Sequence, residues 1–255
     1  MRMALSTGSF YPYLTTLEGC QAAAEAGFSW VEIVLQGHEE HSLSFAHQLA
    51  RLCANLKVKP VALHPRAEFF QTSDYRDAAN CPLFQQMVDF AGLIQSPLMV
   101  FHGPGRNSDI EVNCEVTHGL LHMAKAARQK GIRFTLENSP SGFCQSPAEF
   151  KEIIACDLDH DLWITLDGYK AAASGYSHEE FLHTLPGRIG HFHYCDSLNR
   201  SGKRLLPGYG NAPLDLILGA LHTAMPNGAC VLEAQEIQDA VLLRSLPEKC
   251  KTWDD

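Results

Sequence analysis

The sequence predicts an α/β protein with a single (β/α)8 TIM-barrel domain over residues 1–255, and the pattern of apolar runs is the main reason. Eight short apolar runs recur at intervals of roughly thirty residues or somewhat more, and an amphipathic stretch follows each of them. Strand and helix alternating eight times is typical of this barrel, which carries its active-site residues at the carboxyl ends of the strands. With 255 residues, 45% of them hydrophobic, the chain can fill one such barrel.

The eight apolar runs are expected to be the strands, because each is short and rich in aliphatic, β-branched or aromatic residues. In chain order they are MALST (3–7), WVEIVL (30–35), PVALHP (60–65), PLMVFHG (97–103), RFTLEN (133–138), LWITLD (162–167), IGHFHYCD (189–196) and CVLEAQ (230–235).

Several of the intervening stretches carry explicit helix signals. Helices are predicted within residues 15–28, 111–131, 146–159 and 211–225. The second ends in basic residues and Gly131, and the third starts with Ser146 and Pro147, a cap followed by proline at the first helical position. By contrast, residues 197–211 show no periodicity, and a loop of that length is expected to be functional.

Charge and composition exclude several classes of protein. The formal net charge of −9 argues against nucleic-acid binding, which normally needs a dense cluster of Lys and Arg. No window approaches the ~18 apolar residues of a membrane span, and no secretory signal pattern is present at the start. Nine cysteines without a C-x-x-C pair suit the reduced thiols of a cytosol. We therefore expect a cytoplasmic protein that acts on a small polar molecule, without a membrane partner; whether it forms a homo-oligomer stays open.

Alternation along each strand predicts which side chains face the barrel interior. When the aliphatic residues take the outer face, the inner face at the strand ends receives Glu137, Asp167, His193 and Glu233, from four consecutive strands. For any one of these residues alone, a helix cap or a solvated rim charge is the more common explanation. Four matches on successive strands favour one shared site instead.

Three carboxylates and an imidazole in one place would repel one another unless a positive charge lay among them. One divalent metal ion is the simplest such charge. Oxygen-rich ligation with one nitrogen favours Mn²⁺, Mg²⁺ or Co²⁺, with Zn²⁺ as an alternative, and Mn²⁺ is our first expectation. His191 lies on the same strand face as His193 but one layer deeper, and we expect it to be a structural donor behind the metal ligands.

At these positions the chain resembles a known group. TLEN, ITLD, GHFHYCDSLNR, LLPGYGN and VLEAQ are similar to strand-end motifs of the sugar phosphate isomerase/epimerase superfamily, also called the xylose isomerase-like or AP endonuclease family 2 barrels. In its ketose 3-epimerases two glutamates, an aspartate and a histidine hold one metal, and the resemblance implies that role for Glu137, Glu233, Asp167 and His193. It also implies that both glutamates are the catalytic acid/base pair, and that Arg200 contacts sugar oxygens.

Two departures from the family pattern affect the predicted chemistry. Where the family has a D-x-x-H motif this chain has Lys170, for which we expect either an anchor for a substrate phosphate or carboxylate or a salt bridge to a rim acid. The three-zinc endonucleases need an Asp-x-His pair that the loop after the seventh run lacks, although His64 and His102 match two of their other ligands. These two histidines are predicted either to bind substrate hydroxyls or to be buried and tied to a carbonyl.

The resemblance implies a metal-dependent isomerase or epimerase for a small sugar, sugar phosphate or 2-oxo acid, in which Glu137 and Glu233 move a proton through an enediolate. Loss of a β-hydroxyl from the same intermediate would make the protein a dehydratase. A non-catalytic barrel subunit is a further alternative, because fold and function are separable. A phosphodiesterase of the endonuclease type ranks below these, since the chain is acidic and lacks the additional ligands.

Overall fold

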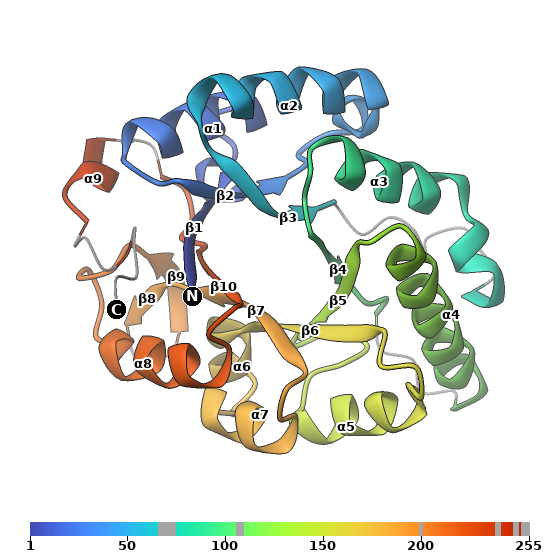
Figure 1. Cartoon of the computed structure of the whole chain (residues 1–255). Coiled ribbons are helices and arrows are strands. Elements are labelled where there is room, and N and C mark those ends of the chain that lie inside the picture. Colours follow the sequence, from blue (N-terminus) through green and yellow to red (C-terminus); the bar gives the residue numbers. More distant parts are fainter. Residues whose placement is uncertain (66–74, 106–109, 199–200, 238–240, 247–249, 251–255) are drawn as a thin grey trace.

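The computed structural model describes residues 1–65, 75–105, 110–198, 201–237, 241–246 and 250, and within them eight parallel strands close into a barrel (Figure 1). The order around the barrel is β1-β10-β7-β6-β5-β4-β3-β2. The barrel strands are β1 (Arg2–Ser6), β2 (Trp30–Val34), β3 (Lys59–His64), β4 (Leu98–His102), β5 (Arg133–Glu137), β6 (Leu162–Asp167), β7 (Ile189–Tyr194) and β10 (Ala229–Leu232). The predicted TIM-barrel fold is therefore confirmed, and each strand overlaps one of the eight predicted runs.

Helices surround the barrel in the order of the chain (Figure 1). They are α1 (Thr16–Glu25), α2 (Leu43–Leu56), α3 (Pro82–Leu93), α4 (Ile110–Gln129), α5 (Pro147–Cys156), α6 (Gly168–Ala173), α7 (His178–Thr184), α8 (Leu214–Ala224) and α9 (Val241–Arg244), with 3-10 turns η1 (Thr7–Phe10), η2 (His38–His41) and η3 (Tyr75–Asn80). All four helices predicted from sequence signals are present. No helix in the described ranges is long and apolar enough to cross a membrane.

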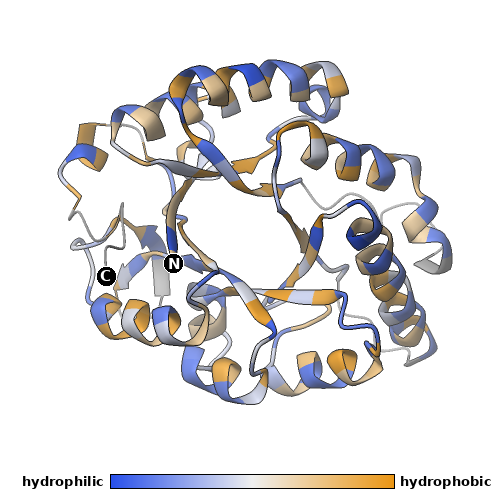
Figure 2. Cartoon of the chain, viewed as in Figure 1, coloured by the Kyte–Doolittle hydropathy of each residue, from blue (hydrophilic) through white to orange (hydrophobic). Residues whose placement is uncertain are grey.

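Local chemistry explains where the helices begin. Thr15 and Ser146 cap α1 and α5, and in each case the glutamate three residues later completes a capping box. These reciprocal hydrogen bonds satisfy backbone N–H groups that the first helical turn leaves without partners. The helices carry hydrophobic and hydrophilic residues side by side, as Figure 2 shows, so that one face of each can pack on the barrel.

Two apolar layers hold the barrel together. Alternate strand residues such as Phe134 and Leu136 point outward and pack against the helices; the Phe134 ring centroid lies 6.1 Å from that of Phe84 in α3. Burying one such side chain stabilises the fold by about 1.5–3 kcal/mol. The opposite strand faces form a smaller cluster of Ala4, Val61, Ala62, Leu98, Val100, Ala229 and Val231, which fills the barrel interior below the site.

The segment after β7 differs from the predicted loop, because part of it forms an antiparallel hairpin of β8 (Asp196–Leu198) and β9 (Ser201–Leu205). The buried Asp196 carboxylate organises the return of the chain by accepting backbone N–H groups of Gly208 and Gly210, both at 2.9 Å, and of Ala212 at 3.0 Å. The hairpin also lies against the end of β10, since Gln235 N–H donates to the Arg204 carbonyl at 2.9 Å. Residues of β9 are thereby brought to the barrel rim.

Candidate metal centre

Four neighbouring barrel strands deliver the predicted ligands to one place. Glu137 ends β5, Asp167 ends β6, His193 is the fifth residue of β7, and Glu233 directly follows β10. One donor atom from each lies within 4.8 Å of the donor atoms of the others. The inward orientation agrees with the predicted alternation, since Thr135 and Thr165, two residues earlier on β5 and β6, hydrogen-bond across the interior at 2.7 Å.

The His193 ring is fixed at both nitrogens. Its Nδ1 lies 3.1 Å from Glu137 Oε1 and 3.3 Å from Glu233 Oε2, and its Nε2 lies 2.9 Å from Glu32 Oε2. Burial lowers the pKa of His193, but the negative charges of Glu32, Glu233 and Glu137 outweigh burial and raise the pKa well above its ordinary value. Without a metal, this imidazole is therefore a cation.

Two further cations of the chain lie among the carboxylates. One is Lys170, for which a salt bridge to a rim acid was one of the two expected roles, and the other is Arg204, which the sequence reasoning had not placed there. Lys170 Nζ is 2.7 Å from Glu137 Oε1 and 3.7 Å from Asp167 Oδ2. Arg204 Nη2 is 2.6 Å from Asp167 Oδ2, and its Nη1 pairs with Glu233. A divalent ion is thus one source of positive charge at this site and not the only one.

Lys170 owes its position to Asp167. The Asp167 side chain is the N-cap of α6 and accepts the Lys170 backbone N–H at 2.8 Å, so the first helical turn directs the lysine back over the strand end. Of the two predicted roles for Lys170, the structure contains the salt bridge to a rim acid. Its ammonium group also lies 3.4 Å from His102 Nε2.

The three carboxyl groups have different pKa values because their neighbours differ. Burial opposes ionisation of Glu137, but the charges of Lys170, His102 and His193 hold its pKa well below the ordinary value. For Glu233 the guanidinium of Arg204 and the imidazolium of His193 outweigh burial and lower the pKa to about 2. Asp167 behaves oppositely, since burial is the largest effect and raises its pKa.

The two predicted pocket histidines sit beside this cluster. His64, at the end of β3, and His102, at the end of β4, approach each other at 3.2 Å between their Nε2 atoms. His102 Nε2 also contacts Glu137 Oε2, and burial lowers the pKa of His102. His64, His102 and Glu137 therefore form a second group that could hold a metal. In the described parts of the chain, the contacts of both histidine rings are to side chains of the site.

The arginine implied by the resemblance, Arg200, lies outside the described residues. The arginine that the structure places in the site is Arg204, four residues further along the same segment. Its guanidinium also lies over the Tyr169 ring, 5.3 Å from the centroid. The sequence contained a signal for it, a cation just before the LLPGYGN motif, but only the β8–β9 hairpin brings that cation to the carboxylates.

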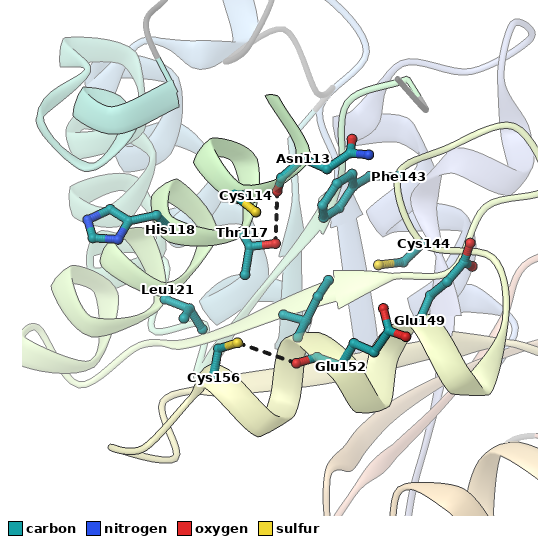
Figure 3. A pocket seen from close by; sticks show the side chains of 11 residues that line it. Asn113, Cys114, Thr117, His118, Leu121, Phe143, Cys144, Glu149, Glu152 and Cys156 are labelled. Carbon is teal, nitrogen blue, oxygen red and sulfur yellow. Dashed lines mark hydrogen bonds between the residues drawn. The ribbon is translucent and has the colours of Figure 1, made fainter. Parts of the chain in front are cut away.

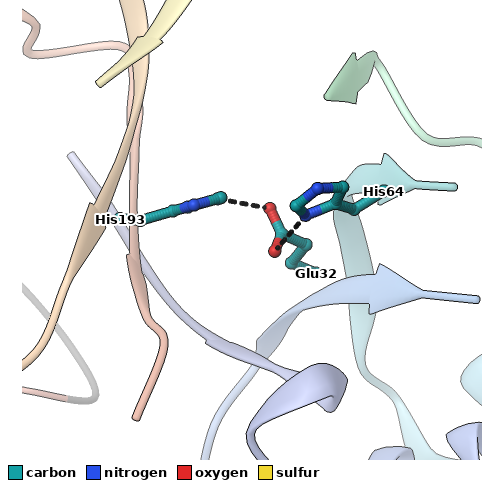
Figure 4. A group of neighbouring side chains, drawn as sticks. All are labelled: Glu32, His64 and His193. Carbon is teal, nitrogen blue, oxygen red and sulfur yellow. Dashed lines mark hydrogen bonds and ion pairs between the residues drawn. The ribbon is translucent and has the colours of Figure 1, made fainter. Parts of the chain in front are cut away.

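Glu32 is the residue that sequence reasoning missed. It lies in the middle of β2, is fully buried, and bonds to His193 and His64 (Figure 4) as well as to His191. Burial raises the pKa of Glu32, but the imidazoles of His193, His191 and His64 outweigh burial and hold the pKa well below its ordinary value. The carboxyl group therefore stays ionised although it is buried. Alternation within WVEIVL places Glu32 on the inner face, but Glu32 lies in the middle of its strand and not at the carboxyl end, where active-site residues of a barrel are expected.

The donor set fits a divalent cation. Two glutamates, one aspartate and one imidazole nitrogen provide four hard or borderline donors, and their atoms already converge within 4.8 Å. Nδ1 of His193 faces carboxylate oxygens of Glu137 and Glu233, so it can share with them either a proton or a metal ion. No thiol is among the donors.

A surface cavity of about 600 Å³ lies elsewhere, between α4 and α5 (Figure 3). It is lined by, among others, Asn113, Thr117, Phe143, Glu149 and Cys156. None of its lining residues belongs to the carboxylate cluster. This cavity is therefore separate from the candidate metal centre, which the converging donor atoms identify.

Comparison with known proteins agrees with the barrel fold. Residues 20–248 match the model of the xylose isomerase-like TIM barrel family. No curated protein matches the chain. Among solved structures, a D-tagatose 3-epimerase-like protein is 21% identical with a TM-score of 0.78, covering 98% of this chain and 97% of that one. IOLI protein with a binding zinc atom is 18% identical with a TM-score of 0.78, covering 98% and 96%. The probable 3-DHS dehydratase AsbF from Bacillus anthracis is 15% identical with a TM-score of 0.80, covering 100% of both chains.

Proposed function

The chain belongs to the xylose isomerase-like TIM barrel family, and we propose that it is a divalent-metal-dependent isomerase or epimerase for a small sugar, sugar phosphate or 2-oxo acid. One observation carries the proposal: donor atoms of Glu137, Asp167, His193 and Glu233 converge within 4.8 Å at the carboxyl-terminal rim of the barrel. Solved structures of the same fold include an epimerase-like protein and one with bound zinc.

These four residues would hold the metal ion, with Mn²⁺ as our first choice. When bound, a divalent ion polarises a substrate carbonyl and lowers the free-energy cost of the negative charge that forms when the neighbouring carbon loses a proton. The protein supplies the groups that move that proton.

Glu137 and Glu233 are proposed as the two proton carriers. They come from β5 and β10, which are separated around the barrel by β6 and β7, so they approach a bound substrate from different directions. Return of the proton to the same carbon epimerises it, and return to the next carbon isomerises the substrate. Glu233 keeps 17% of its side chain exposed and Glu137 none, so Glu233 is the more accessible base.

Arg204 controls the strength of that base. A carboxyl group with a pKa near 2 is a poor proton acceptor at neutral pH, and the Arg204 guanidinium is the main charge that lowers the pKa of Glu233. A substrate oxygen that draws this guanidinium away would raise the pKa of Glu233 when the substrate binds. We propose that Arg204 and Lys170 bind substrate oxygens, with Lys170 as the anchor for a carboxylate or phosphate and with His64 and His102 contacting hydroxyl groups.

A dehydratase is the second candidate, and Lys170 is the observation that favours it. An ammonium group at the rim suits a substrate with a carboxylate, and the AsbF structure, described as a probable 3-DHS dehydratase, shares the fold over the whole chain. Product analysis separates the two functions, since a dehydratase releases water and forms a double bond while an epimerase conserves the formula.

The first experiment is metal content by mass spectrometry of protein purified without chelator, for the wild type and His193→Ala. We expect about one divalent ion per chain in the wild type and its loss in the variant. His47→Ala, an exposed histidine of α2, is the matched control and should keep the metal. A wild type that binds no metal even after reloading would refute the proposal.

The proton-transfer roles are tested by solvent deuterium incorporation into candidate ketoses and oxo acids. Glu233→Gln should keep the fold and lose exchange at the substrate carbon. Unchanged incorporation in this variant would remove Glu233 from the acid/base pair.

A further inference from the structure

Glu32 is fully buried in β2, and its carboxylate contacts the imidazoles of three histidines, His64, His191 and His193. Its Oε2 lies 2.7 Å from His191 Nε2 and 2.9 Å from His193 Nε2. Its Oε1 accepts the Ser6 hydroxyl at 3.1 Å and faces His64 Nδ1 at 3.4 Å. Figure 4 shows the carboxylate between the His193 and His64 rings.

Stability alone does not explain this carboxylate. Throughout the described part of the chain, its hydrogen-bond and ion-pair partners are imidazoles and one hydroxyl, with no lysine or arginine. Moving a carboxylate from water into the protein interior carries a large desolvation cost. Replacing a buried ion pair with well-packed apolar residues often leaves the stability of a protein unchanged or increases it. A role in the site is therefore the better explanation for a charge at this depth.

The geometry decides which nitrogen of His193 is free for other chemistry. An ionised carboxylate only accepts hydrogen bonds, so without a metal each ring nitrogen of His193 carries a proton, and the proton on Nε2 is bound by Glu32, which is not one of the four proposed ligands. The other nitrogen, Nδ1, faces Glu137 and Glu233, the two proposed glutamate ligands. Only a nitrogen without a proton binds a metal ion, and the hydrogen bond at the opposite nitrogen determines which one that is.

We propose that Glu32 is a positioning residue that holds His193 with its proton on Nε2 and so presents Nδ1 to the metal. This inference rests on the proposed metal site. His191 keeps the carboxylate in place, because its Nε2 donates to the same oxygen that His193 uses. Two residues on one face of β7 thus have different roles: His193 is the proposed ligand, and His191 holds the Glu32 carboxylate that orients His193.

The test compares Glu32→Met, which keeps the approximate length and removes the acceptor, with Glu32→Gln, which keeps one acceptor oxygen. Zinc affinity, measured by competition with a chelator, should fall about 10- to 100-fold in Glu32→Met. Glu32→Gln should recover most of the affinity. Thr165→Val is the matched control, because Thr165 is another buried polar residue of the barrel interior and its hydroxyl bonds to Thr135, not to a proposed ligand; its affinity should equal that of the wild type.

A second measurement does not depend on any variant folding. ¹⁵N NMR of the zinc-loaded wild type should show His193 protonated at Nε2 and coordinated through Nδ1, and coordination through Nε2 would overturn the inference. A folded Glu32→Met variant that binds zinc with wild-type affinity would overturn the inference as well. If Glu32→Met does not fold, a zinc-loaded Glu32→Gln variant in which His193 is protonated at Nδ1 and coordinated through Nε2 would overturn it. A wild type that binds no metal would instead remove the proposed function, and this inference with it.

Discussion

Lys170→Met should tighten metal binding, because the Lys170 ammonium group competes for the same carboxylate. Its Nζ lies 2.7 Å from Glu137 Oε1, and only 17% of the side chain is exposed. A hydrogen bond between charged groups contributes about 1.5–3 kcal/mol net, and each 1.4 kcal/mol is a factor of ten in affinity. In the wild type, a metal ion that binds Glu137 Oε1 must first displace the Lys170 ammonium group from this oxygen. In Lys170→Met there is no ammonium group to displace. We therefore expect the Mn²⁺ affinity of Lys170→Met to rise by about tenfold to a hundredfold.

The assay is titration of metal-free protein with Mn²⁺, with free Mn²⁺ followed by electron paramagnetic resonance. Lys170→Arg keeps the charge and should stay near the wild type. Lys203→Met removes an exposed ammonium group that pairs with Glu236 at 2.7 Å, and it should leave the affinity unchanged. Equal or weaker Mn²⁺ binding by Lys170→Met would refute the competition. If Lys170 also anchors substrate, the same variant should raise KM for acidic substrates and leave KM for neutral sugars unchanged.

Three further outcomes follow from the same contacts. Arg204→Met removes the nearest cation from Asp167 and Glu233, so the metal-free protein should lose about 3–5 kcal/mol of stability and recover it on addition of Mn²⁺; an unchanged thermal midpoint would contradict this. Because the folded-state pKa of Glu233 is lowered from 4.5 to about 2, its contribution to the free energy of unfolding should be complete above pH 4.5 and disappear as the pH falls toward 2. Denaturant titrations from pH 6 to 2.5 measure that loss, which should be smaller in Arg204→Met. In Gly168→Ala the new Cβ would lie 2.7 Å from Phe192 Cζ, so overpacking should cost about 1–3 kcal/mol, and wild-type stability in chemical denaturation would argue against it.

The positions of the four proposed ligands could be predicted because they depend on local rules. Period-two alternation places Glu137 and Glu233 on the inner faces of their strands, and parallel strands in a barrel end at one rim. Those rules needed no knowledge of which strands are neighbours. The assignment of these residues to catalysis and metal binding stays a prediction.

The other parts of the site depend on contacts between distant segments. Arg204 reaches Asp167 across 37 residues, and Glu32 reaches His193 across 161. From the sequence a metal ion was the simplest balancing charge, because a salt bridge from Lys170 was only one of two alternatives and Arg204 could not be placed among the acids. A cation four residues away from Arg200, on a segment without periodicity, could be placed only by the hairpin that Asp196 organises.

The order of strands and helices, and the face on which each strand carries its acid or histidine, were determined by the sequence alone, because both follow from short-range periodicity and steric alternation. The tertiary structure decided how the charges of the site are balanced. Electrostatic partners are chosen by distance in space and by exclusion from water. Burial of Glu32 beneath His193, and the approach of Lys170 and Arg204 to the rim, arise only when the barrel closes and brings β2 and the β8–β9 hairpin to the same carboxyl groups.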